Sequence, residues 1–317
     1  MPEPSRILVT GSIAYDTIMV FPDRFKNHLL ADQLHILNVC FLTPEMRREY
    51  GGTAGNIGYN LTRLGAAPLV MATVGEDIQP YLERLDELGI GSAHLRRIRG
   101  QFTAQAFITT DLDDNQITAF HPGAMNYSHE NRVSSSLGAR LAIVSPDGKQ
   151  GMQEHARQCA EHGIAFVFDP GQGLPMFSAG ELTEFVQLAQ YVAVNDYEGK
   201  MLEDRTDRKL EDLARQVKAL VVTLGARGSL VFADGKRHEI PSVEAERLVD
   251  PTGCGDAYRA GLLYGIAQGW DWPVCGRLGA VMGAVKIAHR GAQNHPLERQ
   301  DIEARYQRAF GYSPWKG

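Results

Sequence analysis

The strongest chemical signal in the sequence is a glycine-rich loop that ends in a carboxylate, Asp250-Pro251-Thr252-Gly253-Cys254-Gly255-Asp256. Apolar residues follow Asp256 at helical spacing, so we expect the loop to open a helix. The backbone N–H groups of Gly253, Cys254 and Gly255 would then lie at a helix N-terminus, where partial positive charge favours an anion. A carboxylate beside an anion suits a general base that takes a proton from an attacking hydroxyl, although Asp256 would equally serve as a helix cap.

Other clusters of glycine or polar residues follow apolar runs. Gly51-Gly52 leads into a predicted helix that carries Asn56, and this backbone and amide could hold a polyhydroxyl ligand. Asp16 follows the first run, where a carboxylate could bind vicinal hydroxyls. Asn195 and Glu198 follow another run and could position a hydrated Mg²⁺, which prefers carboxylate and water oxygens. Each cluster alone is equally consistent with a tight turn or a solvated loop. A further glycine cluster, Thr223 to Gly228, ends another run.

The hydrophobic pattern predicts the elements that would bring these clusters together. Short continuous apolar runs suit strands buried on both faces, and stretches with helical spacing lie between them. This alternation predicts an α/β fold whose sheet is covered by helices on both faces. In such sheets ligands bind at the carboxyl ends of the strands. The predicted strands are 6–13, 69–74, 141–145, 164–168, 191–194 and 220–224, and helices are predicted at 55–65 and 80–88.

Two segments interrupt this alternation. Residues 27–48 have the pattern of extended chain without a helix, and residues 105–120 have that of a hairpin with its turn at Asp113-Asp114-Asn115. We expect these parts, within about 17–48 and 101–122, to form a small β-sheet lid inserted in one domain that spans 1–317. The same stretches would also suit an edge that pairs two subunits, so a homodimer through the lid stays an alternative.

Composition argues against several other classes of protein. The chain has 32 Lys+Arg against 38 Asp+Glu, a net charge of −6, so we expect neither nucleic acid nor an anionic membrane surface as a partner. No run of about 20 apolar residues could cross a bilayer. The four cysteines form no C-x-x-C pair, and the first residues lack the pattern of a secretory signal. These features predict a cytoplasmic protein.

Two common nucleotide-binding motifs are missing from the sequence. No G-x-x-x-x-G-K-[ST] occurs, which excludes a P-loop. A dinucleotide motif would need glycine at position 258, where Tyr258 stands, so a nicotinamide-dependent oxidoreductase is disfavoured.

Together and in this order, the clusters resemble the motifs of the ribokinase-like, PfkB-type carbohydrate and nucleoside kinases. The resemblance covers essentially the whole chain, and a Gly-x-Gly-Asp signature preceded by Asp-x-Thr is specific. Within the family, the segments Gly51 to Asn56 and Pro122 to Met125 look like those of the actinobacterial type of adenosine kinase. The resemblance implies a three-layer α/β/α core with a small β-sheet lid. It also implies transfer of the γ-phosphate of MgATP to the ribose 5′-hydroxyl of adenosine.

The resemblance assigns catalytic and acceptor-binding roles to particular residues. Asp256 would be the general base, while the amides of Gly253, Cys254 and Gly255 would stabilise the transferring phosphoryl group. The implied acceptor-binding residues are Asp16, Gly52 and Asn56 for the ribose hydroxyls, Ser12 and Gln172 near the base, Phe107 and Phe120 stacked against adenine, and Asp250 on the substrate side of the glycine loop.

The resemblance also implies the nucleotide and ion sites. The segment Thr223, Leu224, Gly225, Ala226, Arg227 and Gly228 would cover ATP together with Asn195. Asn195 and Glu198 would position Mg²⁺, directly or through water. Many family members need a monovalent cation near the anion-binding loop, so K⁺ is a further implied ion. Its backbone ligands would fall within His289 to Gln293.

Stacking helps to separate a nucleoside acceptor from a bare sugar, because an aromatic platform contributes about 1–3 kcal/mol only where a base is present. The aromatic residues would equally fill an apolar face of the lid. A ribokinase or another nucleoside or sugar kinase therefore stays an alternative, and so does a purine- or sugar-binding protein without phosphoryl transfer. A general base facing the phosphate would be of no use to such a binding protein.

Overall fold

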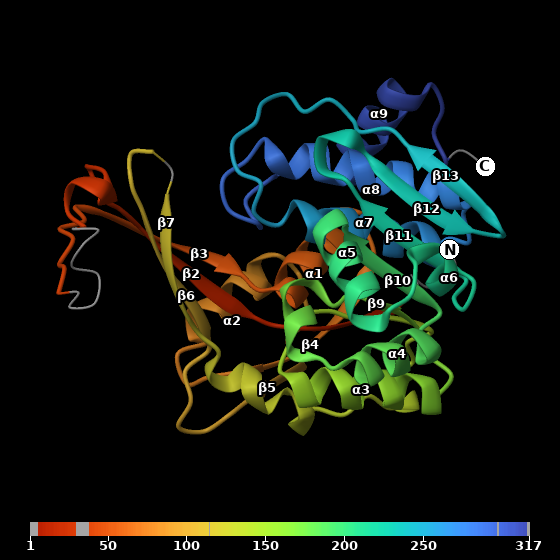
Figure 1. Ribbon diagram of the computed structural model, residues 1–317, viewed down its shortest axis with the longest axis horizontal. Coiled ribbons are helices and arrows are strands. Elements are labelled where there is room, and N and C mark those ends of the chain that lie inside the picture. Colours follow the sequence, from red (N-terminus) through yellow and green to blue (C-terminus); the bar gives the residue numbers. More distant parts are fainter. Residues whose placement is uncertain (1–5, 30–37, 114, 297, 316–317) are drawn as a thin grey trace.

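A computed structural model describes residues 6–29, 38–113, 115–296 and 298–315 of the chain. Its main element is a nine-stranded sheet in the order β13-β12-β11-β10-β9-β8-β1-β4-β5 (Figure 1). Seven of its strands run parallel, and β12 and β13 close one edge as an antiparallel hairpin. The strands are β1 (Arg6–Thr10), β4 (Ala67–Val74), β5 (His94–Arg97), β8 (Leu141–Val144), β9 (Ala165–Phe168), β10 (Tyr191–Asn195), β11 (Ala219–Thr223), β12 (Ser229–Ala233) and β13 (Lys236–Ile240).

Alternate residues of the central strands enter two separate hydrophobic cores. In β1, Ile7 and Val9 face one core and Leu8 faces the other, and all three are buried. The first core packs against α1 (Thr53–Arg63), α2 (Gln79–Glu87), α7 (Cys254–Ala267), α8 (Trp272–Ile287) and α9 (Arg299–Phe310). The second packs against α3 (Lys149–Glu161), α4 (Ala179–Leu188), α5 (Asp196–Thr206) and α6 (Leu210–Ala214). The predicted three-layer α/β/α fold is confirmed.

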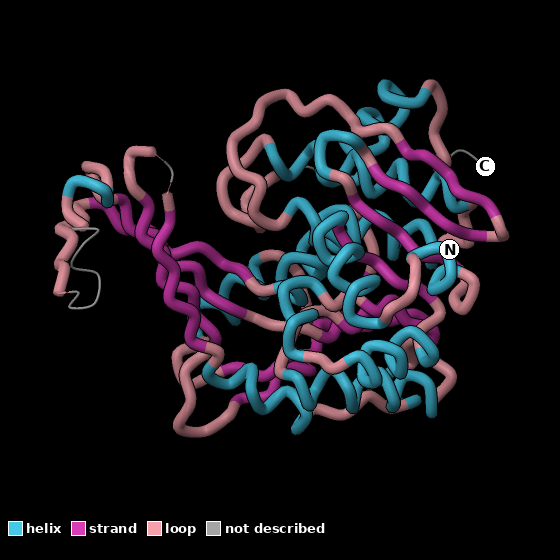
Figure 2. Tube along the Cα trace, in the orientation of Figure 1, coloured by secondary structure: helices cyan, strands magenta, loops and turns pink. Residues whose placement is uncertain are grey.

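A second sheet of four strands stands apart from the main one (Figures 1 and 2). Its order is β3 (Glu45–Gly51), β2 (Ala14–Val20), β6 (Ala104–Thr110) and β7 (Gln116–His121), so both predicted insertions contribute to it. The hairpin is confirmed. The extended stretch expected over 27–48 is a strand only from Glu45 onward; residues 38–44 form no regular element, and 30–37 lie outside the described residues.

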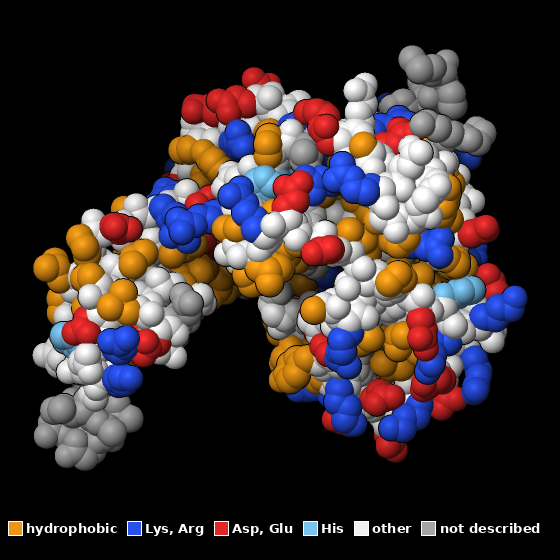
Figure 3. All heavy atoms as spheres, turned by 90° about the horizontal axis from the view of Figure 1, so that it is seen from above, with side chains coloured by type: hydrophobic (Ala, Val, Ile, Leu, Met, Phe, Trp, Pro, Cys, Tyr) orange, Lys and Arg blue, Asp and Glu red, His pale blue; other side chains and the backbone are white. Residues whose placement is uncertain are grey.

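This second sheet projects from the body as an arm with hydrophobic side chains on its surface (Figure 3). All six residues of β7 are exposed, and Met46 of β3 is 70% exposed. These exposed apolar side chains form a patch of the kind found at interaction sites. Among the helices that the structure describes, none is long and apolar enough to span a membrane.

Candidate functional site

The predicted site residues gather where the parallel strands of the main sheet end. Asn195 ends β10 and lies beside Thr223, the last residue of β11, in the parallel register. On the other side, the Ser12 N–H after β1 donates to the Pro146 carbonyl after β8 at 3.1 Å. Five consecutive strand ends, from β1 to β11 across the sheet, therefore point their loops toward one edge, as the parallel pattern predicts.

Asp256 lies in the first turn of α7 and is held by a residue of α1. The Asn56 side-chain amide donates to Asp256 Oδ2 at 2.8 Å. Burial raises the pKa of Asp256 to about 6, while the Arg259 charge and the Asn56 hydrogen bond lower it and Glu198 raises it. A carboxylate with this pKa is ionised near neutral pH and is basic enough to accept a proton from a hydroxyl as its reaction proceeds.

The glycine loop opens α7 as the sequence predicts, and Gly253 is its N-cap. Gly253 has φ +77°, and a Cβ there would lie 2.7 Å from the Ala292 Cβ, so only glycine suits this position. The helix begins at Cys254, earlier than the predicted start at Asp256, which places the Cys254 and Gly255 amides in its first turn. The Cys254 N–H donates to the Pro251 carbonyl at 3.1 Å, and the helix dipole gives this N-terminus, beside the Asp256 carboxylate, a partial positive charge that favours an anion.

Asp250 fixes the shape of this loop. Its Oδ1 accepts from the Thr252 N–H and its Oδ2 from the Gly291 N–H, both at 2.9 Å. Burial raises the pKa of Asp250, but these two hydrogen bonds and the Lys286 charge lower it by more. The net shift is downward. The carboxylate is therefore ionised and joins the loop to the segment after α8.

Asp16 and the Gly51-Gly52 pair lie together at the junction of the two sheets. A Cβ added to Gly51 would lie 2.7 Å from Asp16 Oδ2. Gly52 has φ +87°, and a Cβ added there would lie 2.5 Å from the Ser12 carbonyl oxygen. Burial raises the pKa of Asp16 to about 6, helped by the charges of Glu49, Asp250 and Asp256. Asp16 therefore lies in the same electrostatic environment as the candidate base.

Ser12 and Gln172 have surroundings that the sequence did not predict. The buried Ser12 hydroxyl accepts the Thr53 N–H at 3.1 Å and lies 3.3 Å from the Thr53 hydroxyl, so it anchors the start of α1. Gln172 is exposed in the short 3₁₀ turn Gly171–Met176 that follows β9.

The two predicted stacking residues lie on opposite faces of the second sheet. Ala106 pairs with both Asp16 and Phe120, whereas Phe107 pairs with Thr17 and Ala119. Because paired residues share a face and neighbours along a strand alternate, Phe120 is on the face of Asp16 and Phe107 is on the other. The two rings therefore do not lie on the same face of this sheet, and the stacking of either ring against a base stays a prediction.

The predicted ATP segment forms the tight connection between β11 and β12. The Leu224 N–H donates to the Gly228 carbonyl at 2.8 Å, and residues Gly225–Arg227 form one 3₁₀ turn. Gly228 has φ +87°, and a Cβ there would meet the Ile240 carbonyl at 2.0 Å. Arg227 is exposed and pairs with Asp196 at 2.8 Å, which joins this turn to the start of α5.

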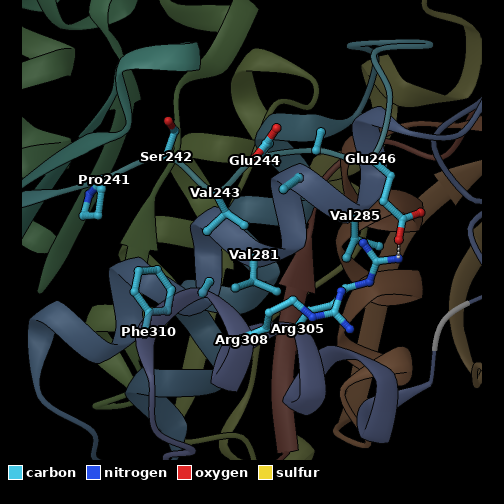
Figure 4. Close-up of a pocket in the computed structure, with 13 residues that line it drawn as sticks. Pro241, Ser242, Val243, Glu244, Glu246, Val281, Val285, Arg305, Arg308 and Phe310 are labelled. Atoms are coloured by element: carbon cyan, nitrogen blue, oxygen red, sulfur yellow. Dashed lines mark hydrogen bonds and ion pairs between the residues drawn. The ribbon is translucent and has the colours of Figure 1, made fainter.

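A cavity of about 600 Å³ lies between the segment Pro241–Glu246, α8 and α9 (Figure 4). This segment begins at the end of β13, where a Cβ on Gly228 of the predicted ATP segment would lie 2.9 Å from the Ser242 nitrogen. Val281 and Val285 of α8 form the apolar wall of the cavity, and Arg305 pairs with Glu246 at its rim at 2.7 Å. Its lining contains none of the residues predicted for the site. The candidate active site is the strand-end edge with its helix N-terminus, and the cavity adjoins this edge beside Gly228.

The arrangement can be compared with known proteins. Residues 12–300 match the model of the pfkB family of carbohydrate kinases. The chain belongs to this family. It is an ATP-dependent phosphotransferase with a hydroxyl group as acceptor, as the sequence predicted.

The relatives that resemble this pfkB-family chain include nucleoside kinases. That of Methanocaldococcus jannaschii is 32% identical over 263 residues, which cover 81% of this chain and 85% of that protein. A nucleoside kinase of Burkholderia thailandensis solved in complex with inosine is 50% identical, with a TM-score of 0.88 over 97% of this chain and 99% of that one. Its structure in complex with ADP-inosine has a TM-score of 0.86 at 51% identity over 97% of each chain.

The pfkB-family assignment implies Mg²⁺, and the donors at the end of β10 fit it. Asn195 and Glu198 form a capping box: Asn195 Oδ1 accepts the Glu198 N–H at 2.7 Å, and Glu198 Oε2 accepts the Asn195 N–H at 2.8 Å. This leaves Glu198 Oε1 for an ion. No group of three or more His, Cys, Asp or Glu side chains suited to a metal occurs in the described residues. One carboxylate with water and phosphate oxygens is the usual environment of nucleotide-bound Mg²⁺.

Sequence reasoning missed a buried ion pair behind the candidate base. Arg259, one turn after Asp256 on α7, pairs with Asp169 at the end of β9, and its NH2 lies 3.6 Å from Glu198 Oε2. Burial raises the pKa of Asp169, and the adjacent Arg259 opposes this shift. One signal in the sequence could have revealed the proximity of Arg259 to the candidate base. Arg259 follows Asp256 by three residues, which places both side chains on one face of a helix. The Arg259 guanidinium therefore joins α7 to two strand-end loops, those after β9 and β10.

Proposed function

We propose that this protein transfers the γ-phosphoryl group of ATP to the 5′-hydroxyl of a purine nucleoside, with adenosine as the acceptor that the sequence predicts. The observation that supports it most directly is Asp256, held by Asn56 at 2.8 Å in the first turn of α7 beside a glycine-built helix N-terminus. A base and an anion site a few ångströms apart are what phosphoryl transfer to an alcohol requires.

The proposed mechanism uses positioning and electrostatics. Asp16, Gly52 and Asn56 hold the ribose hydroxyls so that the 5′-oxygen approaches the phosphate in line. Asp256 accepts the 5′-hydroxyl proton as the new O–P bond forms, and the amides of Gly253, Cys254 and Gly255 stabilise the charge on the transferring phosphoryl oxygens. Asn56 orients the Asp256 carboxylate throughout, because the Asn56 amide is itself fixed: its Oδ1 accepts from Gln293 Nε2 at 2.9 Å.

The nucleotide side of the site would be built from the loops after β10 and β11. Residues Thr223 to Gly228 cover ATP, and Asn195 and Glu198 hold the Mg²⁺, which supplies charge neutralisation on the phosphates. Arg227, in this segment, is held by its ion pair with Asp196.

The base of the acceptor is the finer part of the proposal. Phe120 lies on the face of Asp16 and supports a purine, since a ring there gains stacking that ribose cannot provide. Inosine is a second candidate, because the 50%-identical Burkholderia thailandensis nucleoside kinase was solved with inosine bound. Gln172 and Ser12 are proposed to contact the base edge.

The test is ADP release with MgATP and, in turn, adenosine, inosine, guanosine, cytidine or ribose. If kcat/KM is highest for adenosine, the proposal is supported as stated. If it is highest for inosine, the reaction is the proposed one but the preferred nucleobase is hypoxanthine. Turnover of ribose with no activity on any of the four nucleosides would refute nucleoside specificity. An Asp256→Asn protein run in parallel separates this activity from a contaminating kinase.

We also propose that two copies pair through the second sheet. The outer face of this sheet carries Phe107, 40% exposed, and the edge strand β7 is exposed along its length. Sedimentation equilibrium would give twice the chain mass, and Phe107→Asp with Ile117→Asp would give a monomer. A wild-type monomer at high concentration would refute the pairing.

A further inference from the structure

The family resemblance implies a monovalent cation bound by backbone carbonyls within His289 to Gln293, and the structure already has a cation there. Lys286, in the last turn of α8, is completely buried. Its ammonium donates to the Asp250 carbonyl at 2.7 Å and to the His289 carbonyl at 3.0 Å. A lysine ammonium and K⁺ are both unit charges that carbonyl oxygens bind in place of water. A free K⁺ therefore does not fit beside this side chain.

The Lys286 ammonium lies directly behind the anion-binding loop. The Val249 and Asp250 N–H groups both donate to the Ile287 carbonyl, so the end of α8 and the start of the loop are joined. From the other side, Gly291 donates to the Asp250 carboxylate at 2.9 Å. Lys286 thus bridges the carbonyls of Asp250 and His289. One ammonium group therefore joins the glycine loop to the segment after α8.

The charge of Lys286 is balanced mainly by carbonyl dipoles. Within the described residues, no carboxylate oxygen lies within 4.0 Å of its Nζ. Burial lowers its pKa, and the nearby Asp250 and Cys254 oppose that shift and favour the ammonium form. Burial raises the pKa of Cys254, the first residue of α7, to about 11, and the nearby Lys286 charge opposes this rise.

We propose that Lys286 is a built-in replacement for the monovalent cation, so that phosphoryl transfer by this protein needs no K⁺. The inference rests on the proposed function. Lys286 acts as a positioning residue: it holds Asp250 and the 289–292 segment so that Gly253, against Ala292, presents its neighbouring amides to the phosphate. Its field adds to the positive potential of the helix N-terminus.

The experiment compares wild type, Lys286→Ala and Lys286→Met in buffers that contain choline chloride or KCl and no other monovalent cation. Wild type is expected to turn over equally in both. Lys286→Ala is expected to lose about 10- to 100-fold in kcat in choline with a smaller change in nucleoside KM, and to recover in KCl or NH₄Cl. Lys286→Met fills the space with a neutral chain and is expected to show the loss without recovery. Lys236→Ala, at an exposed site of β13, is the matched control.

A second measurement does not depend on turnover. Since K⁺ would bind only the folded state, Lys286→Ala is expected to unfold at a higher temperature in KCl than in choline chloride, while wild type shows no difference. Stimulation of wild type by K⁺, full activity of Lys286→Ala in choline, or a loss in that variant that K⁺ cannot restore would overturn the proposal. If Lys286→Ala does not fold in either salt, Lys286→Met with wild-type kcat would overturn it, and reduced kcat with normal nucleoside binding would support it.

These outcomes are separate from failure of the proposed function. A wild-type protein that phosphorylates no nucleoside refutes that function, and the salt dependence of the unfolding temperatures then tests Lys286 alone. A wild-type kinase that K⁺ activates keeps the function and refutes the role of Lys286.

Discussion

Asn56 and Asp256, 200 positions apart in the sequence, are joined by a 2.8 Å hydrogen bond from the side-chain amide to the carboxylate. The same amide group accepts from Gln293, whose Nε2 also lies 2.7 Å from the Tyr81 hydroxyl. The candidate base is therefore fixed by a chain of polar side chains from α1, α2 and the segment after α8. A base in a fixed orientation loses little entropy when its substrate binds.

Replacement of the base tests the mechanism directly. Asp256→Asn is expected to lower kcat by about 10²–10⁴-fold and to leave nucleoside binding nearly intact, because the carboxylate acts mainly in the transition state. The kcat/KM of wild type should rise with pH through the pKa of Asp256, about 6, and level above it. Steady-state kinetics and calorimetric binding of the nucleoside measure both. Near-wild-type turnover of the variant would mean that Asp256 is only a helix cap.

Removal of the Asp16 charge should stabilise the fold while it weakens acceptor binding. The pKa of Asp16 rises from 3.8 to about 6 on folding, so its ionisation costs the native state about 3 kcal/mol above pH 6 and nothing well below pH 4. Asp16→Asn should therefore gain stability relative to wild type as pH increases from 4 to 6, and the gain should be constant above that. Urea unfolding at pH 4, 5, 6 and 8 measures it. A difference that does not vary with pH would contradict the raised pKa.

The two lid phenylalanines should respond differently to truncation. Phe120→Ala is expected to raise the KM of the nucleoside by about 10-fold or more with little change for ATP, since a lost stacking contact costs about 1–3 kcal/mol. Phe107→Ala, on the opposite face, should leave the nucleoside KM of a single subunit nearly unchanged. KM values for both substrates in both variants decide this. Equal effects on the nucleoside would show that the rings act through the fold of the sheet or across a dimer.

The buried pair of Arg259 and Asp169 should be sensitive to the loss of one partner. Asp169→Ala is expected to reduce the free energy of unfolding by about 3–5 kcal/mol, because it leaves the guanidinium buried without its counter-charge. The double variant Asp169→Ala with Arg259→Met should lose less than the two single losses together. The exposed pair of Arg96 and Glu130, 2.8 Å apart, is the control, and Glu130→Ala should cost under about 1 kcal/mol. Additive losses in the buried pair would contradict the coupling.

The pattern of apolar runs was sufficient to predict the parallel core, because strands buried on both faces leave an unmistakable composition. All six predicted strands exist. The hairpin of β12 and β13 was not predicted, since β13 reads Lys-Arg-His-Glu-Ile and only its last residue is buried. An edge strand that faces water on one side lacks the continuous apolar run on which the prediction depended.

The faces of Phe107 and Phe120 show a different limit. Thr110 pairs with Gln116, which leaves an odd number of residues in the hairpin loop. A hairpin loop one residue shorter would shift the pairing of the two strands by one residue. Both rings would then lie on one face, because the side-chain period of a strand is two. Composition predicted a turn at residues 113–115 but could not fix its length. Lys286 was missed for a related reason, since contacts to carbonyls leave no trace in side-chain types.

In the proposed function, the chemistry depends on the Asp256 hydrogen-bond network and acceptor recognition depends on Phe120 of β7, and these two parts of the molecule differ in how much substitution they tolerate. Asp256, Asn56 and Gln293 are joined to one another, and a substitution at any of them disturbs the rest. Strand β7, exposed at every residue, contributes little to the core, and surface substitutions of this kind usually change stability by about 0.5 kcal/mol or less. In the proposed function, substitutions along β7 can therefore change the acceptor preference without disturbing the hydrogen bonds that hold Asp256.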